Sequence, residues 1–265
     1  MIITLITDFG NRDPYVAMMK GVILSISPHV SIVDISHAVP PHDIDEAGLI
    51  LKRSYSFFPE NTIHVIVVDP GVGSDRAIIA VKTDHYIFLA PDNGVLQPVL
   101  SEYPEADIFQ VTNEKYFLQE VSNTFHGRDI FAPVAAHLAN GVELSDIGDP
   151  FSDFVARSIP KPVKTEDGVT GVVTGFDHFG NVLTNIHSEL LPENLKYIIQ
   201  LQSNNINSIH KSYSDVPDGE VLGLIGSSGV LEISINRGNA RDQLTVSKGD
   251  PVVVKLKSDG ESSES

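Results

Sequence analysis

Three acidic residues of the N-terminal half stand where predicted strands end or helices begin: Asp8 in TDFG, Asp13 in NRDPY and Asp69 in VVDPGVGSDR. The two carboxylate oxygens of Asp8 suit the adjacent hydroxyls of a ribose, although an aspartate at such a place also stabilises turns. Asp13 precedes Pro14 and could simply cap a helix. None of the three carboxylates identifies a site by itself.

Asp69 follows a run of Val and Ile, and an ionised carboxylate that emerges from such a strand needs a partner. Arg76 is the obvious candidate, either in a structural salt bridge or in a reactive pair. The intervening PGVGS contains two glycines, whose backbone N–H groups could face a cavity and hold water or a small anion. It is not a phosphate loop, because no Lys-Ser or Lys-Thr follows the second glycine.

The segment NTFHGRDIFAPVAAHLA places His126 just before a predicted helix, for which Asp129 is the expected cap. At a helix start, the dipole keeps the pKa of an imidazole low, so His126 could orient a water or accept its proton. The alternative is a hydrogen-bonded histidine at a helix entry with no role in chemistry. Both interpretations stay open on the local sequence.

The second half of the chain offers two further groups. In FDHFGNVLTNI, Phe179 could stack on a purine while Asn181 bonds its edge, beside Asp177; an ordinary hairpin turn is the alternative. In IGSSGVLEISINRGNA, the hydroxyl of Ser227 and the turn amides could bind a carboxylate, with Asn236 beyond the next strand. A serine-rich β-turn explains the same residues.

The elements that must position these residues predict a two-domain protein of the α/β class. In residues 1–157, short β-branched runs alternate with helical patterns, which is typical of a mainly parallel central sheet covered by helices. Ligands of open α/β sheets lie beyond the carboxyl ends of the strands, where Asp8 and Asp69 stand. Residues 169–258 contain short strand candidates separated by turns and predict a smaller all-β barrel.

Two segments are expected to lie outside the domains. Residues 158–168 contain two prolines, several charges and no periodicity, which indicates an interdomain linker. Residues 259–265 are polar and repetitive, and we expect them to be disordered.

Composition restricts the possible partners. The net charge of −17 disfavours nucleic acid, and no apolar run reaches the length of a membrane span. The N-terminus lacks the basic start and apolar stretch of a signal peptide, so we expect a cytoplasmic protein. Cysteine is absent from the 265 residues, which excludes disulfides, a thiol nucleophile and thiolate metal ligands.

Taken together, TDFG with DPY, VDPGVGSDR, NTFHGRD, FDHFGN and SSGVLEISINRGNA resemble the S-adenosyl-L-methionine (SAM) hydroxide adenosyltransferase family, relatives of fluorinases and chlorinases. The motifs occur in order from residue 5 to about residue 240. The resemblance implies hydrolysis of SAM by attack of water on the ribose C5′ carbon, giving adenosine and methionine without a metal or cofactor. It also implies a homotrimer with active sites between one chain's first domain and a neighbour's second.

The same resemblance assigns residues. Asp69, Arg76 and His126 would position the water, and Asp8 would hold the ribose hydroxyls. The methionine end would meet Asp13, Asp177 and Ser227. The adenine pocket would be formed by Phe179, Asn181, Asn236, the main chain at Arg237 and, as a stacking wall, Tyr213. Halogenating relatives favour an aromatic and hydroxyl-bearing residues where this chain has Asp69, Val72 and Gly127, which favours water as the nucleophile.

Three alternatives remain. A metal-dependent hydrolase would draw on His64, Asp69, His126 and Asp129, but their spacing matches no compact ligand motif. A chlorinase-like halogenase would use the same substrate with a different nucleophile. A non-catalytic SAM or adenosine-binding protein would share the pocket and return its ligand unchanged.

Overall fold

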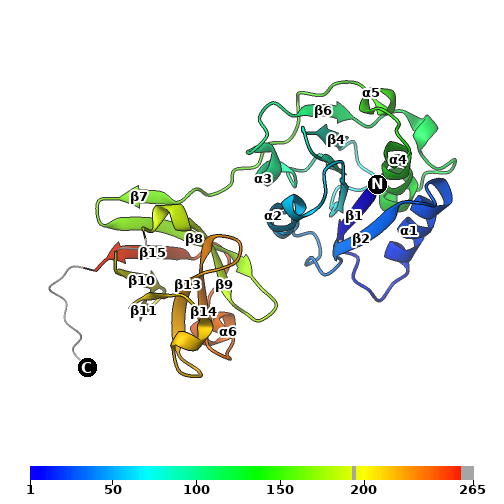
Figure 1. The fold of residues 1–265 in the computed structure, drawn as a ribbon. Coiled ribbons are helices and arrows are strands. Elements are labelled where there is room, and N and C mark those ends of the chain that lie inside the picture. The colour runs from blue at the N-terminus through cyan, green and yellow to red at the C-terminus, as the bar shows by residue number, and fades with distance from the viewer. Residues whose placement is uncertain (193–194, 258–265) are drawn as a thin grey trace. The chain divides into compact units, whose positions relative to one another are not determined.

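The computed structural model describes residues 1–192 and 195–257 and divides into two compact units, Met1–Ile159 and Pro160–Ser265 (Figure 1). Each unit is described on its own. The tail predicted to be disordered, residues 259–265, lies outside the described residues.

The N-terminal unit alternates strands and helices through its first part, as predicted. Its elements are β1 (Ile2–Thr7), α1 (Tyr15–Ile26), β2 (Ser31–Ser36), α2 (Ile44–Ser54), η1 (Tyr55–Phe57), β3 (Ile63–Val67), β4 (Ile78–Lys82), β5 (Ile87–Pro91), α3 (Gln97–Leu100), β6 (Asp107–Gln110), η2 (Glu114–Tyr116), η3 (Gly127–Phe131), α4 (Ala132–Ala139) and α5 (Leu144–Ile147). The sheet order is β2-β1-β3-β5-β4-β6. Strands β2, β1, β3 and β5 are parallel, and β4 runs antiparallel to both neighbours, so the predicted mainly parallel sheet is confirmed.

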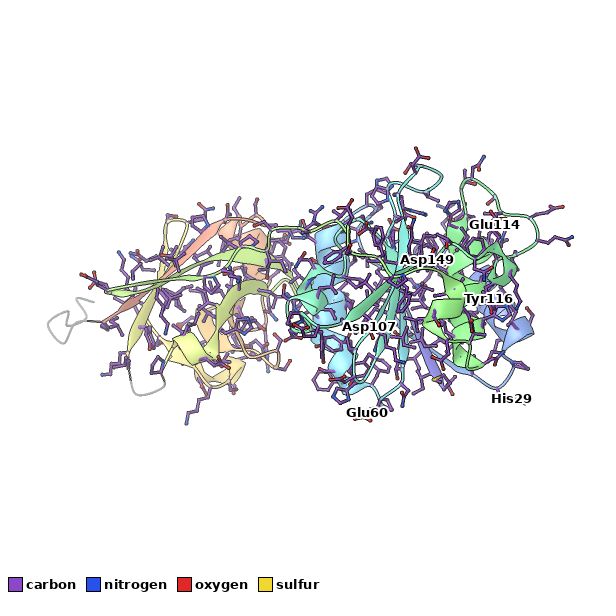
Figure 2. All side chains as sticks on the ribbon, turned by 90° about the horizontal axis from the view of Figure 1, so that it is seen from above. His29, Glu60, Asp107, Glu114, Tyr116 and Asp149 are labelled. Carbon is purple, nitrogen blue, oxygen red and sulfur yellow. The ribbon has the colours of Figure 1, made fainter. Side chains whose placement is uncertain are left out.

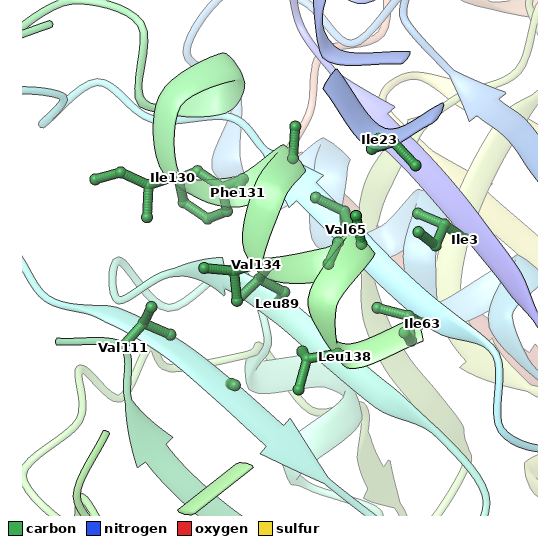
Figure 3. Close-up of a cluster of buried hydrophobic side chains, with 14 of the residues drawn as sticks. Ile3, Ile23, Ile63, Val65, Leu89, Val111, Ile130, Phe131, Val134 and Leu138 are labelled. Carbon is green, nitrogen blue, oxygen red and sulfur yellow. The ribbon is translucent and has the colours of Figure 1, made fainter. Parts of the chain in front are cut away.

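Helices cover both faces of this sheet, because its central strands are apolar on both sides. On one face, α1 and α4 pack over Ile3, Ile63 and Val65, with Phe131 and Val134 reaching down from the helical segment (Figure 3). On the other face, α2 and α3 cover a second apolar cluster that contains residues of β1, β3 and β5. The helices on the two faces hold the sheet in place, so the loops that follow its strands emerge at defined positions.

Neighbouring strands bring two candidate carboxylates to one edge of the sheet. Thr7, the last residue of β1, lies opposite Val67, the last residue of β3. Asp8 follows the first strand directly, and Asp69 follows the second after one further buried residue. The prediction that both stand at carboxyl strand ends is therefore confirmed.

Two aspartates near this edge precede helices, and one of them is a cap. Asp43 accepts a hydrogen bond from the backbone N–H of Glu46 and caps α2. Asp13 does not cap α1: the helix begins at Tyr15, Pro14 occupies the N-cap position, and no side chain caps it. Asp13 is instead an exposed residue of the preceding turn.

The C-terminal unit is built almost entirely from strands. Its elements are β7 (Val163–Thr165), β8 (Gly168–Phe176), β9 (Val182–His187), η4 (Ser188–Leu190), β10 (Tyr197–Leu201), β11 (Asn204–Ile206), β12 (Ile209–His210), η5 (Tyr213–Asp215), β13 (Val221–Ile225), β14 (Val230–Ile235), α6 (Ala240–Leu244) and β15 (Pro251–Leu256). Part of the expected linker belongs to this unit, because β7 pairs with β8; residues 151–162 hold no helix or strand.

The nine strands form one sheet in the order β11-β10-β15-β8-β9-β14-β13-β12, with β7 also on β8. The sheet curls around a single apolar core, and β11 approaches β13 across it, which gives the barrel-like form expected from the sequence. Gly223 of β13 permits this closure, because a Cβ there would lie 2.3 Å from the side chain of Ile199 on β10.

The negative charge is dispersed over the surface. Exposed acidic residues of the N-terminal unit, such as Glu60, Asp107, Glu114 and Asp149, lie on separate elements (Figure 2). Within the described residues, no helix has both the length and the apolar character needed to cross a membrane.

Candidate active site

Asp69, Arg76 and His126 meet at the carboxyl edge of the N-terminal sheet. Nε of Arg76 donates to both oxygens of Asp69, at 3.1 and 2.9 Å, and Nη2 donates to Oδ2 at 2.5 Å. The same Nη2 lies 2.8 Å from Nδ1 of His126. The side chains of Asp69 and Arg76 are only 5% and 12% exposed, so their charges attract each other in a medium far less polar than water.

This arrangement fixes the protonation of the imidazole. A guanidinium has only donors, so Nδ1 of His126 must accept the bond from Arg76, and the proton of the neutral ring lies on Nε2. Burial and the charge of Arg76 lower the pKa of His126 below its ordinary value, although Asp69, Asp129 and a contact with the backbone of Ser122 oppose the shift. His126 is therefore neutral at pH 7 and offers an N–H donor.

Asp69 and His126 line a cavity of about 310 Å³ in the N-terminal unit. The wall is completed by residues at the end of β3, in the loops after β1, β2 and β3, at the start of α1, and around the start of η3: Asp8, Phe9, Tyr15, Pro41, His42, Val67, Val72, Thr124, Phe125 and Gly127. Arg76 joins Asp69 to His126 without lining the cavity itself. A molecule in the cavity would meet a carboxylate and an imidazole that are held in place from outside.

Asp129 anchors the segment that carries His126. Its carboxylate is fully buried and accepts bonds from the backbone N–H and the hydroxyl of Ser122, at 2.8 and 2.7 Å, and from the guanidinium of Arg128. The Ser122 hydroxyl in turn accepts the N–H of Phe125 at 3.1 Å. The prediction that Asp129 caps a helix is therefore wrong: it fastens the preceding loop, and a π-helical turn, η3, leads from His126 into α4.

The loop between Asp69 and Arg76 depends on a glycine. Gly73 has a φ of +77°, and a Cβ there would lie 2.3 Å from the carbonyl oxygen of Asn123. A side chain at this position would separate the loop from the segment that carries His126. The second glycine of PGVGS thus permits the approach of two loops that are far apart in the sequence.

Asp8 is held by a residue that the sequence analysis missed. The backbone N–H of His42 donates to Oδ2 of Asp8 at 2.9 Å, and both residues line the cavity. His42 has a φ of +67°, a left-handed conformation that is uncommon for histidine and is found where the surroundings enforce it. Only a loop conformation set by the fold could reveal this contact.

Three aromatic rings form the apolar side of the cavity. Phe9, Tyr15 and Phe125 pack with centroid separations of 5.1 to 5.8 Å and with tilted or edge-to-face geometry. Arg128 lies over the ring of Phe125 at 5.2 Å. Such an electron-rich wall is compatible with a positively charged ligand.

The candidates in the C-terminal unit lie on separate segments, which are described in two sets. In the first, Asp177 accepts bonds from the backbone N–H groups of Phe179 and Asn181 and from the side-chain amide of Asn181, around a turn in which Gly180 has a φ of +84°. Phe179 is 73% exposed at this turn. The turn thus has the hairpin geometry considered as the alternative, and the ring of Phe179 is open to solvent.

In the second set, Tyr213 donates to the buried carboxylate of Glu232 at 2.6 Å, a contact that the sequence analysis missed. Burial, that bond and nearby Asp177 raise the pKa of Tyr213. Asn236 and Arg237 are bonded to Asp218, the latter through an exposed ion pair. Ser227 is exposed in the tight turn between β13 and β14.

The residues proposed for a metal site are each engaged in other contacts. Asp69 binds Arg76, Asp129 binds Arg128 and Ser122, and His64 is fully buried with Nδ1 2.8 Å from the hydroxyl of Thr4. Across residues 1–192 and 195–257, no group of three or more His, Asp or Glu side chains is arranged to hold a metal ion.

The burial of His64 predicts that the stability of the folded protein depends on pH. Burial lowers its pKa from 6.5 to about 4, so the unfolded chain takes up a proton at a higher pH than the folded protein does. The folded state therefore loses stability as the pH falls from about 6.5 towards 4, by about 2 kcal/mol at pH 5. Urea unfolding at pH 7.5 and 5.0 should show this loss in the wild type and a smaller one in a Thr4→Val/His64→Phe double variant. Equal losses would contradict it.

Family models and curated relatives match most of the chain. A family model for the SAM hydroxide adenosyltransferase N-terminal domain matches residues 3–148, and one for the C-terminal domain matches residues 171–253. The (R)-S-adenosyl-L-methionine hydrolase of Salinispora arenicola (strain CNS-205) is 36% identical over 259 residues, 95% of this chain and 97% of the relative. A fluorinase of Actinoplanes sp. (strain N902-109) is 34% identical over 229 residues, 76% of this chain and 77% of the relative.

A solved structure is also similar to this chain over nearly its whole length. An uncharacterized conserved protein from Thermotoga maritima has a TM-score of 0.91 and 39% sequence identity to this chain, covering 96% of this chain and all of that one. Both family models together span most of the two units described above. The chain therefore belongs to the SAM hydroxide adenosyltransferase family.

Proposed function

We propose that this protein hydrolyses S-adenosyl-L-methionine to adenosine and L-methionine. The observation that carries the proposal is the joined set of Asp69, Arg76 and His126, two of which face a cavity that also contains Asp8. The relative from Salinispora arenicola, named a (R)-S-adenosyl-L-methionine hydrolase, supports the choice of substrate.

The proposed reaction suits a site without a strong acid. A bond forms between the oxygen of water and the ribose C5′ carbon, while the bond from C5′ to sulfur breaks. Its electron pair goes to sulfur, which turns the sulfonium into the neutral thioether of methionine. The water loses one proton and its oxygen becomes the 5′-hydroxyl of adenosine. Because the sulfonium is already a good leaving group, alignment and exclusion of bulk water matter most.

The hydrogen bonds divide the roles among the three residues. Nδ1 of His126 is occupied by Arg76, so the ring can hold the water as an Nε2–H donor but cannot accept a proton at Nδ1 without losing that bond. Asp69 lines the cavity; its Oδ2 accepts two bonds from Arg76, whereas its Oδ1 accepts one long bond and keeps acceptor capacity. Asp69 is thus the proposed proton acceptor, with Arg76 as the positioning residue for both neighbours.

The remaining assignments concern substrate binding. Asp8 would hold the ribose hydroxyls, and Asp13, Asp177 and Ser227 would meet the methionine end. The adenine pocket would comprise Phe179, Asn181, Tyr213, Asn236 and the main chain at Arg237. These residues belong to both units, and a homotrimer with active sites between chains would bring them together. Sedimentation velocity would test the trimer. A cytoplasmic location remains a prediction from the sequence.

The experiment with the clearest readout uses ¹⁸O-labelled water. Incubation with SAM should give equal amounts of adenosine and methionine, with the label in the 5′-hydroxyl of adenosine, as mass spectrometry would show. Recovery of unchanged SAM would indicate a binding protein instead. In the presence of chloride, a 5′-chloro-5′-deoxyadenosine product would favour the halogenase alternative. Loss of turnover after chelation with EDTA would contradict a metal-independent reaction.

A further inference from the structure

We infer that His37 is a positioning residue for the ribose-binding carboxylate, acting through the hydroxyl of Thr7. The inference rests on the proposed function, in which Asp8 holds the ribose hydroxyls. His37 does not line the cavity, and no motif of the sequence analysis contains it. Its contacts nevertheless join the two loops that present Asp8 and His42.

The chain of contacts begins at the surface and ends beside the cavity. Lys20 donates to Asp34 at 2.5 Å, and Oδ1 of Asp34 lies 3.0 Å from Nε2 of His37. The side chain of His37 is only 4% exposed, and its Nδ1 lies 2.9 Å from the hydroxyl oxygen of Thr7, which is fully buried. That oxygen also lies 3.3 Å from the backbone N–H of Phe9.

The chemistry of Asp34, His37 and Thr7 determines which atom donates and which accepts in each of these contacts. Burial raises the pKa of Asp34, but the contacts with Lys20 and His37 outweigh burial and lower it, so the carboxylate stays ionised. Its charge, 3.0 Å from Nε2 of His37, favours a proton on that nitrogen, although the two atoms lack the alignment of a hydrogen bond. Nδ1 is then an acceptor, and Thr7 must donate its hydroxyl proton to it. With the proton so directed, a lone pair of Thr7 faces the N–H of Phe9.

The backbone completes the connection to Asp8. The carbonyl oxygen of His37 accepts the N–H of Gly10 at 2.8 Å, so both the ring and the main chain of His37 hold the turn of residues 7–10. Further along the same segment, the N–H of His42 donates to Oδ2 of Asp8. His37 therefore sets the distance between the strand-end loops whose contact orients the Asp8 carboxylate.

The protein contains a matched control for this arrangement. Thr4, on the same strand as Thr7, makes the same type of bond to a buried histidine: its hydroxyl lies 2.8 Å from Nδ1 of His64. Both threonines are fully buried and neither lines the cavity, but Thr7 directly precedes the cavity residues Asp8 and Phe9, whereas Thr4 does not. Thr4→Val and Thr7→Val thus remove chemically equivalent bonds, and only the second lies next to the proposed ribose site.

The test is the affinity of the full-length protein for adenosine and 2′-deoxyadenosine, measured by isothermal titration calorimetry. A carboxylate held in place should make the wild type prefer adenosine by about tenfold, since bonds to charged groups are the stronger ones. Thr7→Val should remove most of this preference by weakening adenosine alone, and Thr7→Ser should restore it. Thr4→Val should keep the full preference. His37→Phe, which keeps a ring and removes both nitrogens, gives the same measurement if Thr7→Val does not fold.

The outcomes separate the inference from the function on which it rests. Loss of the preference in Thr7→Val with recovery in Thr7→Ser supports the positioning role. Equal weakening of both ligands, or an unchanged preference in Thr7→Val and His37→Phe, overturns it and leaves the proposed hydrolysis intact. A wild type that binds no adenosine, or binds both nucleosides equally, counts against Asp8 as the ribose ligand and overturns the inference with it.

Discussion

Asp69→Asn should lower kcat for SAM hydrolysis by about 10² to 10⁴, the usual range for removing a group that handles a proton or stabilises charge in the transition state. The amide still offers one oxygen to Arg76, so the loop should keep its place, but it cannot accept a proton from water. The rate of adenosine formation, followed by chromatography at saturating SAM, is the measurement.

Binding must be measured with a ligand that avoids two complications. Loss of a negative charge weakens attraction to the sulfonium, and the 5′-hydroxyl of adenosine would itself touch residue 69. The neutral 5′-deoxyadenosine escapes both effects, so its affinity should change by less than about threefold in Asp69→Asn. Asp75→Asn, at an exposed carboxylate of the same loop, is the matched control and should keep full turnover. Wild-type turnover in Asp69→Asn would remove the basis of the proposed mechanism.

The fold was largely predictable because its signals are local. Continuous apolar runs in the N-terminal half and short alternating strands in the C-terminal half each suit one kind of sheet, and both kinds are present. The antiparallel direction of β4 and the pairing of β7 were not predicted. Each depends on which strand a segment meets, and the sequence of the segment does not contain that information.

The candidate site was predictable to the level of residue types and strand ends. Asp8 and Asp69 follow the neighbouring parallel strands β1 and β3. Because the carboxyl ends of parallel strands meet at one edge of a sheet, both residues lie at that edge. His126 reaches them through a loop: its place before a helix marked it as a candidate, but only its occurrence in a recognised motif joined it to Asp69. The contact of His42 with Asp8 was missed, because it depends on a left-handed backbone conformation without glycine.

The two mistaken caps share a physical cause. Asp13 and Asp129 both stand at sequence positions typical of helix N-caps, but capping is only one use of a short carboxylate side chain. For Asp129, the hydroxyl and N–H of Ser122 together with Arg128 provide more bonds than the one N–H that an N-cap side chain usually binds. For Asp13, Pro14 takes the cap position and leaves the carboxylate exposed.

Arg76→Met should destabilise the protein by about 3–5 kcal/mol, because it leaves the carboxylate of Asp69 buried without its counter-charge. The matched control is Arg157→Met. Arg157 also makes a two-pronged contact with an aspartate, Asp45, but these side chains are 39% and 58% exposed. Solvent screens such a pair, so its removal should cost at most about 1 kcal/mol. Urea unfolding at pH 7 gives both values, and similar small losses would show that burial of Asp69 is not costly.

A double variant separates stability from chemistry at this pair. In Asp69→Asn/Arg76→Met no charge is left uncompensated, so at least about half of the stability lost in Arg76→Met should return. Turnover should not return with it, because the proton acceptor is absent and Nδ1 of His126 has lost its donor. Recovery of stability without recovery of activity would mean that Arg76 holds a reactive carboxylate and imidazole in place. If activity returned with stability, the ion pair would be a structural bridge, and the chemistry would have to be assigned to other residues of the cavity.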